Sequence, residues 1–279
     1  MTGSLVLREK VYRAYLEFFE IAETKRRWNM FNDVPWEALD SSTGSEQKTA
    51  CIEIFCAEEL YLPDYSAGGV ELTRSMFGAA WFQACWSYEE SKHGLVFREY
   101  LTRSGQRSNA EMAAFEERVL SKVWRLPFQT RRQMACYGAL QEAATFLAYK
   151  VQKDKAMSEG DKVLEAIFFL LSRDEAAHAG FYRAAVELEL DEDRDGTLAD
   201  LAYVIANFKM PGDGLIPDYQ ERLLATGAGI SARTFLERAL LPMLRTLGTS
   251  RAELKVAMAR LSAAATSAAA TSAVLVAAK

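Results

Sequence analysis

Histidine is scarce in this chain, with two among 279 residues, His93 and His178. An excess of positive charge is also missing, because 33 Lys and Arg stand against 38 Asp and Glu, for a formal net charge of −5. This balance argues against nucleic acid or an anionic membrane as the main partner. No apolar run approaches the roughly 18 residues that span a bilayer, and Arg8, Glu9 and Lys10 bring charge before a secretory core could form. We therefore expect a cytoplasmic protein.

Several common site motifs are absent as well. The four cysteines form no C-x-x-C pair and are expected to be small core residues rather than zinc or redox ligands. There is no glycine-rich phosphate loop and no serine nucleophile elbow. The acidic run that starts at Asp191 begins like a calcium loop, but its twelfth position is Ala202 rather than glutamate, so we expect no calcium site.

The hydrophobic pattern is helical throughout. Apolar residues recur at three- and four-residue spacing, and six prolines leave room for long helices, so we expect an all-α fold. The helices are expected near residues 4–28, 46–62, 67–104, 109–125, 129–155, 160–189, 197–209, 217–226, 230–247 and 250–276.

Four of these helices, 46–62, 67–104, 129–155 and 160–189, are long and apolar enough to form a bundle. We expect one domain over residues 1–279. Its parts would be a bundle core at about 46–189, a helical extension at 197–261 and an alanine-rich tail at 262–279.

Both histidines stand three residues after a glutamate: Glu90 precedes His93, and Glu175 precedes His178. Three helical residues turn the chain by about 300° and rise about 4.5 Å, so each pair projects from one helix face a single turn apart. Each pair can therefore hold one ion. A further acid immediately precedes each of the two glutamates.

Further carboxylates stand on the other two core helices. Glu58 and Glu59 lie among apolar residues of the first, and Glu142 is the only acid between Arg131 and Lys153 on the third. Carboxylates gathered in a core each lose several kcal/mol of solvation, which two divalent cations would offset. Oxygen donors with two imidazoles suit iron or manganese better than copper, and no H-E-x-x-H run or thiolate set indicates zinc. We expect iron.

Four runs resemble the soluble acyl-carrier-protein desaturase family of the ferritin-like di-iron superfamily, over roughly residues 20–190. The runs that resemble the family's four ligand helices are Ala57 to Glu59 leading to Leu62-Pro63, Trp86 to Gly94 (WSYEESKHG), Gln141 to Phe146 (QEAATF) and Asp174 to His178 (DEAAH).

The resemblance implies a ferritin-like four-helix bundle with additional helices, two iron ions and O2 as co-substrate. It implies that the metal ligands are Glu59, Glu90, His93, Glu142, Glu175 and His178, with Glu90 and Glu142 or Glu175 able to bridge. The chain has an extra residue between the double glutamate and Leu62-Pro63, so Glu58 stays an alternative first ligand.

Three further residues take roles from chemistry and resemblance together. A metal-bound imidazole usually donates its other N–H to a carboxylate, and the family pattern assigns Asp174 to His93. Trp28 corresponds to a tryptophan that would extend this chain toward the surface as an electron route. Thr145 resembles a threonine beside the oxygen pocket, where a hydroxyl could pass a proton. Core packing is the alternative for Trp28 and Thr145.

A channel for the acyl chain should lie beside the ligands, although packing in the bundle core is the alternative for its residues too. The candidates on the ligand-bearing helix faces are Phe55, Trp86, Gly138, Phe146, Leu171 and Tyr182.

The expected activity is O2-dependent insertion of a double bond into an acyl chain held on acyl carrier protein. By resemblance, a ferredoxin-type donor supplies electrons and the protein is a homodimer. The carrier is acidic, so basic groups could dock it. The two candidate groups are Arg125, Arg131 and Arg132, and Lys150, Lys153 and Lys155.

Three alternatives remain at this point. The same ligands could hydroxylate a carrier-tethered natural-product intermediate, because both reactions share the first hydrogen abstraction. Bacterioferritin uses the same ligand pattern for iron storage, which a large cage would reveal. The radical subunit of ribonucleotide reductase is disfavoured, because Pro63 stands where that family has its tyrosine.

Overall fold

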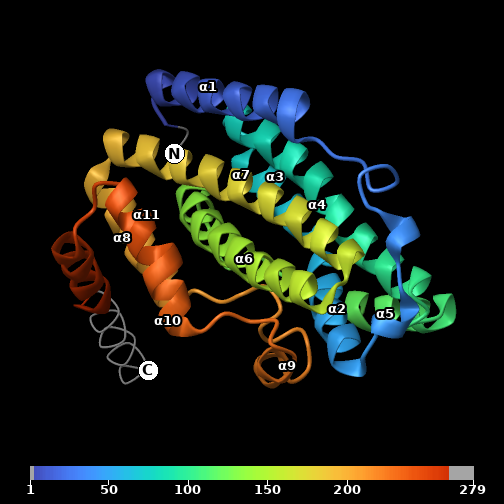
Figure 1. Ribbon diagram of the computed structural model, residues 1–279. Helices are drawn as coiled ribbons and strands as arrows, with labels where there is room; N and C mark the ends of the chain where they lie inside the picture. The colour runs from blue at the N-terminus through green and yellow to red at the C-terminus, as the bar shows by residue number, and fades with distance from the viewer. Residues whose placement is uncertain (1–2, 264–279) are drawn as a thin grey trace.

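The computed structural model describes residues 3–263, and this part of the chain consists of helices and loops without a β-strand (Figure 1). The all-α prediction is confirmed. The α-helices are α1 (Leu5–Ile21), α2 (Glu46–Glu59), α3 (Leu62–Thr73), α4 (Phe77–Arg103), α5 (Asn109–Leu120), α6 (Arg131–Glu159), α7 (Lys162–Glu192), α8 (Arg194–Ala206), α9 (Tyr219–Thr226), α10 (Ala232–Phe235), α11 (Leu241–Thr246) and a last helix at 251–263. Two π-helical turns (Ala22–Arg26, Leu236–Leu240) and two 3-10 turns (Trp36–Ala38, Ser41–Thr43) complete the set.

Helices α6 and α7 form an antiparallel hairpin at the centre of the molecule (Figure 1). Gly160 ends α6 in the left-handed conformation, at φ 75°, which costs glycine least because it has no Cβ. The Asp161 carboxylate then accepts from the Leu164 N–H at 3.0 Å and starts α7. This two-residue connection places α6 and α7 side by side, so Glu142 and Glu175 can face each other.

Helix α1 crosses the bundle as an added layer. Its buried side chains follow one face, at Leu7, Val11, Tyr15 and Phe18. The backbones of α1 and α4 meet at Gly78, where a Cβ would lie 2.6 Å from Tyr12 Cα. The π-helical turn after α1 then leads the chain across α4 and α7, close to the metal-site candidates.

The single helix predicted over 67–104 is wrong. The chain breaks it between α3 and α4, where Met76 has extended backbone angles of φ −127° and ψ 103°. Nothing in the local sequence Arg74 to Met76 is a helix breaker. The Met76 side chain is fully buried in the core that includes Leu7, so tertiary packing of this side chain accompanies the break.

The carboxyl-terminal third also differs in detail from the expected helices. The helix predicted at 230–247 is divided into α10, a π-helical turn and α11. The helix predicted at 250–276 is described at 251–263, and the rest of it, with nearly all of the alanine-rich tail, lies outside the described residues. The described helices include none long and apolar enough to cross a membrane.

The four cysteines are buried and free, as the sequence predicts. Burial raises the pKa of the Cys51 thiol to about 12, so it stays protonated at neutral pH and behaves as a small apolar group.

Candidate metal centre

The six predicted ligands come together between α2, α4, α6 and α7. They form two overlapping groups, and within each group one ligand atom per residue lies within 4.8 Å of the others. The first group is Glu59, Glu90, His93 and Glu175, and the second is Glu90, Glu142, Glu175 and His178.

The Nδ1 atom of each histidine faces the carboxylates. His93 Nδ1 lies 3.0 Å from Glu90 Oε2 and 3.3 Å from Glu175 Oε1. His178 Nδ1 lies 2.9 Å from Glu90 Oε1 and 3.7 Å from Glu142 Oε2. Despite these distances both Nδ1 atoms, with Glu90 Oε1 and Glu175 Oε2, are buried without a hydrogen bond of acceptable geometry. Buried polar atoms that lie close together without hydrogen-bond partners can be satisfied by a bound cation.

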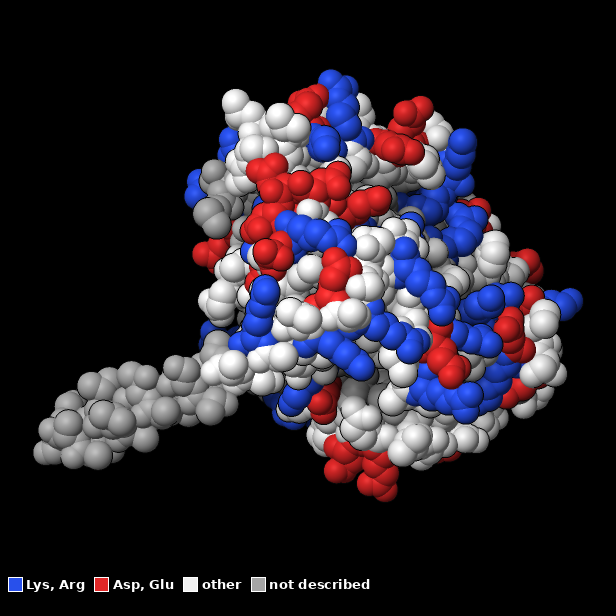
Figure 2. Space-filling view, turned by 90° about the vertical axis from the view of Figure 1, so that its left-hand side faces the viewer, with Lys and Arg blue, Asp and Glu red and all other residues white. Residues whose placement is uncertain are grey.

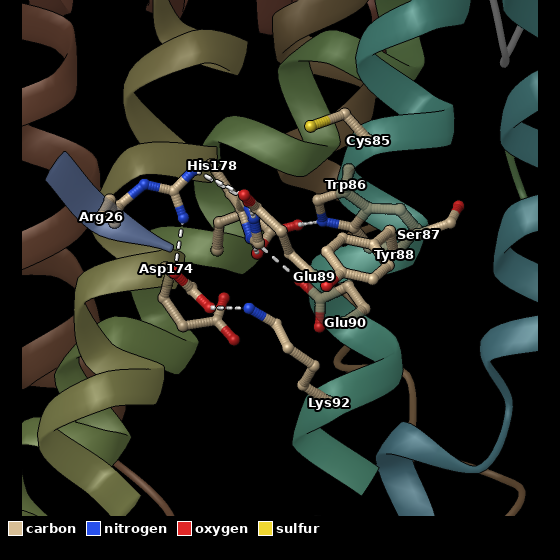
Figure 3. Close-up of polar contacts among 12 residues, drawn as sticks. Arg26, Cys85, Trp86, Ser87, Tyr88, Glu89, Glu90, Lys92, Asp174 and His178 are labelled. Atoms are coloured by element: carbon tan, nitrogen blue, oxygen red, sulfur yellow. Dashed lines mark hydrogen bonds and ion pairs between the residues drawn. The ribbon is translucent and has the colours of Figure 1, made fainter. Parts of the chain in front are cut away.

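The Nε2 atoms face two other carboxylates, and Figure 3 shows His178 beside Glu89. His178 Nε2 lies 2.8 Å from Glu89 Oε2, and His93 Nε2 lies 3.4 Å from Asp174 Oδ2. A carboxylate on the second ring nitrogen fixes the tautomer and orientation of a metal-binding histidine. Asp174 was predicted from the sequence and Glu89 was not, although each is the acid immediately before an E-x-x-H pair.

Burial and mutual repulsion disfavour the ionised forms of two carboxyls. Burial and the charge of Glu90 raise the pKa of Glu59 to about 7. Burial, Glu90 and Glu142 raise the pKa of Glu175 well above its usual value. In both cases the shift arises because negative charges share a buried volume. Such a set binds either protons or a metal cation.

The histidines show the opposite effect. Burial would lower their pKa values, but the surrounding carboxylates outweigh it and hold the pKa of His93 and His178 well above the usual value. Burial would raise the pKa of Glu90, yet the two histidines lower it to about 2. In the absence of metal, the imidazoles therefore act as the cations of the cluster. Two divalent ions could take over this role, so the donor set fits a two-metal centre.

Two ligands have a fixed hydrogen-bond donor. Trp86 Nε1 donates to Glu142 Oε1 at 3.0 Å, and the Tyr149 hydroxyl donates to Glu59 Oε1 at 2.6 Å. Glu58 instead accepts from the Tyr219 hydroxyl, so the geometry favours Glu59 as the first ligand. Tyr219 belongs to a segment without recognisable motifs, and no sequence signal links it to this site.

A narrow cavity opens onto the ligand carboxylates, with about 50 Å³ available to the centres of water molecules. One face of α6 lines it, from Met134 to Tyr149. Tyr65, Trp124 and Met210 also line it and are partly exposed, so the cavity approaches the surface beside them. The remaining lining residues are Glu58, Glu59, Trp86, Glu90, Tyr137, Gly138, Gln141, Glu142, Thr145, Glu175, Tyr182 and Pro211.

Three of the six predicted channel residues line this cavity, namely Trp86, Gly138 and Tyr182. A Cβ on Gly138 would lie 2.6 Å from the Tyr182 ring, so the glycine lets this ring lie against α6. Gln83 Nε2 donates to the Tyr182 hydroxyl at 2.7 Å. The ring is therefore a fixed wall of the cavity.

The other three predicted channel residues lie elsewhere. Phe55 packs on Phe97 and Phe168, with ring centroids 5.9 and 5.8 Å apart, and Leu171 is buried in the same core cluster. Phe146 is half-buried and is outside the cavity lining.

Thr145 and Trp28 both lie beside the ligands. Thr145 lines the cavity, and its Oγ1 donates to the Gln141 carbonyl at 3.1 Å and accepts from Gln141 Nε2 at 3.0 Å. Buried Trp28 donates its Nε1 hydrogen to Asp174 Oδ2 at 2.7 Å. Lys92 Nζ lies 4.4 Å from the Trp28 ring centroid. Trp28, Asp174 and His93 thus form one chain of polar contacts.

Comparisons with known proteins find a desaturase family and related desaturases. A family described as fatty acid desaturase matches residues 58–234, more than half of the chain. DesA1 of Mycobacterium tuberculosis, a candidate acyl-[acyl-carrier-protein] desaturase, is 24% identical over 223 residues. Chloroplastic acyl-[acyl-carrier-protein] desaturase 4 of Oryza sativa subsp. japonica is 30% identical over 161 residues.

The matched share differs between these relatives. The DesA1 match covers 75% of this chain and 64% of DesA1, and the rice match covers 56% and 38%. The chain thus spans less than two thirds of either curated relative. The X-ray structure of DesA2 from M. tuberculosis H37Rv, a candidate acyl-ACP desaturase, superposes with a TM-score of 0.64 at 18% identity, covering 90% of this chain and 99% of that one. The chain has the ferritin-like helical fold and belongs to the acyl-[acyl-carrier-protein] desaturase family.

Proposed function

We propose that this protein is an O2-dependent di-iron desaturase that introduces a double bond into an acyl chain held on acyl carrier protein. The observation that carries the proposal is the convergence of two buried E-x-x-H pairs and two further glutamates at the inner end of a narrow cavity. Family membership and the names of the relatives support the same activity.

The six ligands would hold two iron ions, with Glu90 and Glu175 common to both groups. Iron bound there would supply the activation of O2. The overall reaction balances when O2 accepts two hydrogens from adjacent carbons of the chain, and two electrons and two protons from outside, to give a carbon–carbon double bond and two waters.

The protein's own part is to position groups and to exclude bulk water. Trp86 and Tyr149 hold the Glu142 and Glu59 carboxylates, and Tyr182 fixes one wall of the cavity. Thr145 offers its Oγ1 proton on the cavity side of the ligands, and Gln141 holds this hydroxyl in place. The narrow cavity would align one stretch of the acyl chain beside the ligands.

The carrier would dock at the outer end of this cavity. Exposed Arg125 adjoins Trp124, and exposed Lys209 adjoins Met210, so positive charge flanks the opening for an acidic partner. The predicted basic group at Arg131 is less suitable, because Arg131 pairs with Glu189.

Arg132 is neutralised in the same way, by Asp193 at 2.7 Å and by Asp200. These pairs lie at the end of the bundle where α6 begins and α7 ends. Figure 2 views the molecule from this end and shows red and blue side chains intermingled there. The charges of Arg131 and Arg132 are therefore compensated and less available to an acidic carrier.

Electrons would come from a ferredoxin-type donor by way of Trp28, Asp174 and His93. The two hydrogen-bond contacts in this chain, at 2.7 and 3.4 Å, support the route.

The decisive experiment combines iron analysis with product analysis. Purified protein should contain two irons per chain and, with a reductant system and acyl carrier substrates, give a product lacking two hydrogens by mass spectrometry. Glu142→Ala and His178→Ala should lose iron and activity together, because each removes a ligand. Unchanged iron in both variants would refute the site.

Hydroxylation of a carrier-tethered intermediate is the second outcome that the same assay distinguishes. A product that gains one oxygen atom would replace the desaturase assignment with that reaction while leaving the metal centre intact.

A further inference from the structure

Two buried carboxylates that support the histidines share one cation. Arg26, at the end of the π-helical turn after α1, is only 7% exposed. Its Nη1 donates to Asp174 Oδ1 at 2.5 Å, and its Nη2 donates to Glu89 Oε1 and Oε2, both at 2.9 Å (Figure 3). Asp174 is the partner of His93, and Glu89 is the partner of His178. One guanidinium thus connects the supports of both imidazoles.

We propose that Arg26 is a positioning residue for both metal positions at once, holding Asp174 and Glu89 so that the two histidines present Nδ1 toward the metals. This inference rests on the proposed two-metal centre. The side-chain hydrogen bonds of Arg26 go to Asp174 and Glu89, and Arg26 is not among the cavity-lining residues, so it acts through the two carboxylates.

Charge and geometry both favour an arginine here. A buried carboxylate without a cation is strongly disfavoured, and Asp174 and Glu89 are together matched by Arg26 with help from Lys92 and Arg27. Only a planar guanidinium can donate from separate nitrogens to two carboxylates at once, whereas a lysine ammonium is a single point charge.

A merely structural role for Arg26 would be to anchor the end of α1. The structure separates the two roles, because the backbone carbonyl of Arg26 has its own anchor. Arg173 Nη2 donates to that carbonyl at 2.6 Å. Arg173→Gln would therefore weaken the anchoring of α1 while leaving the guanidinium between Asp174 and Glu89, and it is the matched control.

The test is an anaerobic titration of metal-free protein with Co(II). The visible ligand-field absorption of the bound Co(II) reports binding. The parent should bind two equivalents. Arg26→Gln, which removes the charge and keeps a similar length, should weaken both binding steps by about 10–100-fold, the usual effect of losing support behind a metal ligand. Arg173→Gln should bind Co(II) like the parent.

The outcomes separate this inference from the proposed function. A parent that binds fewer than two equivalents would refute the two-metal centre itself. The parent should show two sites. If Arg26→Gln then loses Co(II) affinity at one step only, or at neither, the shared role of Arg26 is refuted. Equal weakening in Arg173→Gln would show that Arg26 serves only to anchor α1.

A second variant is used if circular dichroism shows that Arg26→Gln does not fold. Arg26→Lys keeps the positive charge but replaces the planar fork, whose Nη1 and Nη2 contact the two carboxylates separately, with a single ammonium nitrogen. It should weaken at least one of the two Co(II) steps by about tenfold or more, and parent-like binding at both steps would refute the proposal.

Discussion

At the scale of single residues, Thr145 allows the sharpest test of how the protein supplies a proton. Its hydroxyl lines the cavity, and its only donated hydrogen bond in the structure goes back to the Gln141 carbonyl one turn earlier. Thr145→Val keeps the shape and removes the hydroxyl. We expect kcat to fall about 100-fold, the usual loss when a positioned proton donor is removed, with KM and iron content unchanged.

Thr145→Ser is the matched control, because it restores the hydroxyl and should recover most of the activity. A Thr145→Val variant with parental kcat would assign Thr145 to packing.

The residues that the sequence could identify are those tied to a fixed helical spacing. Both E-x-x-H pairs and Glu142 stand out, because helix geometry alone places each pair on one face and because an isolated acid in an apolar stretch needs a partner. Arg26 could not be found in this way. It reaches the site from the turn after α1, across contacts with Asp174 and Glu89 that only the packed bundle creates.

At the scale of elements, helix content was predictable and the interruption of a helix was not. The pattern predicts continuous helix over 67–104, and local propensity at Arg74 to Met76 offers no reason for a stop. The burial of Met76 against residues that include Leu7 is a contact between segments far apart in sequence. The break between α6 and α7 was predictable, because Gly160 is a strong signal for ending a helix, although α6 runs to Glu159 rather than to the expected residue 155.

The crossing of α1 over α4 gives the prediction at this scale. A methyl group added at Gly78 would lie 2.6 and 2.7 Å from the Tyr12 Cα and N atoms, and a backbone cannot rotate away as a side chain can. Gly78→Ala should lower the free energy of unfolding by about 1–3 kcal/mol, as overpacking does, measured by urea unfolding.

Gly180, in the middle of α7, is the control glycine because a Cβ there meets nothing within 4 Å. Gly180→Ala should raise the free energy of unfolding by about 0.5–1 kcal/mol through helix propensity. Equal effects of the two substitutions would contradict a close approach of α1 and α4 at Gly78.

At the scale of the whole molecule, α4 has an exposed apolar face that suits a second copy of the chain. Phe77, Trp81, Tyr88 and Leu95 are each 51–55% exposed, and the last three follow at seven-residue intervals along one helix. Two copies of such a stripe can pair about a twofold axis, since each presents the same surface to the other. We expect a homodimer in solution by light scattering.

Trp81→Glu should convert this dimer to a monomer, because it places a charge at the centre of the stripe. Phe169→Glu is the control, since Phe169 is comparably exposed at 48% but lies on α7. A monomeric parent would contradict the pairing, and a large cage would indicate iron storage instead.

The two ring nitrogens of each histidine give the centre two distinct approaches. The cavity reaches the ligands from the Nδ1 side, and its lining includes none of Trp28, Glu89 and Asp174, which contact the Nε2 side. An acyl carrier protein and an electron-transfer protein would therefore not compete for the same binding surface. The electron donor could stay bound through several catalytic cycles while product leaves and new substrate binds. Turnover would then not require the two partners to bind in turn.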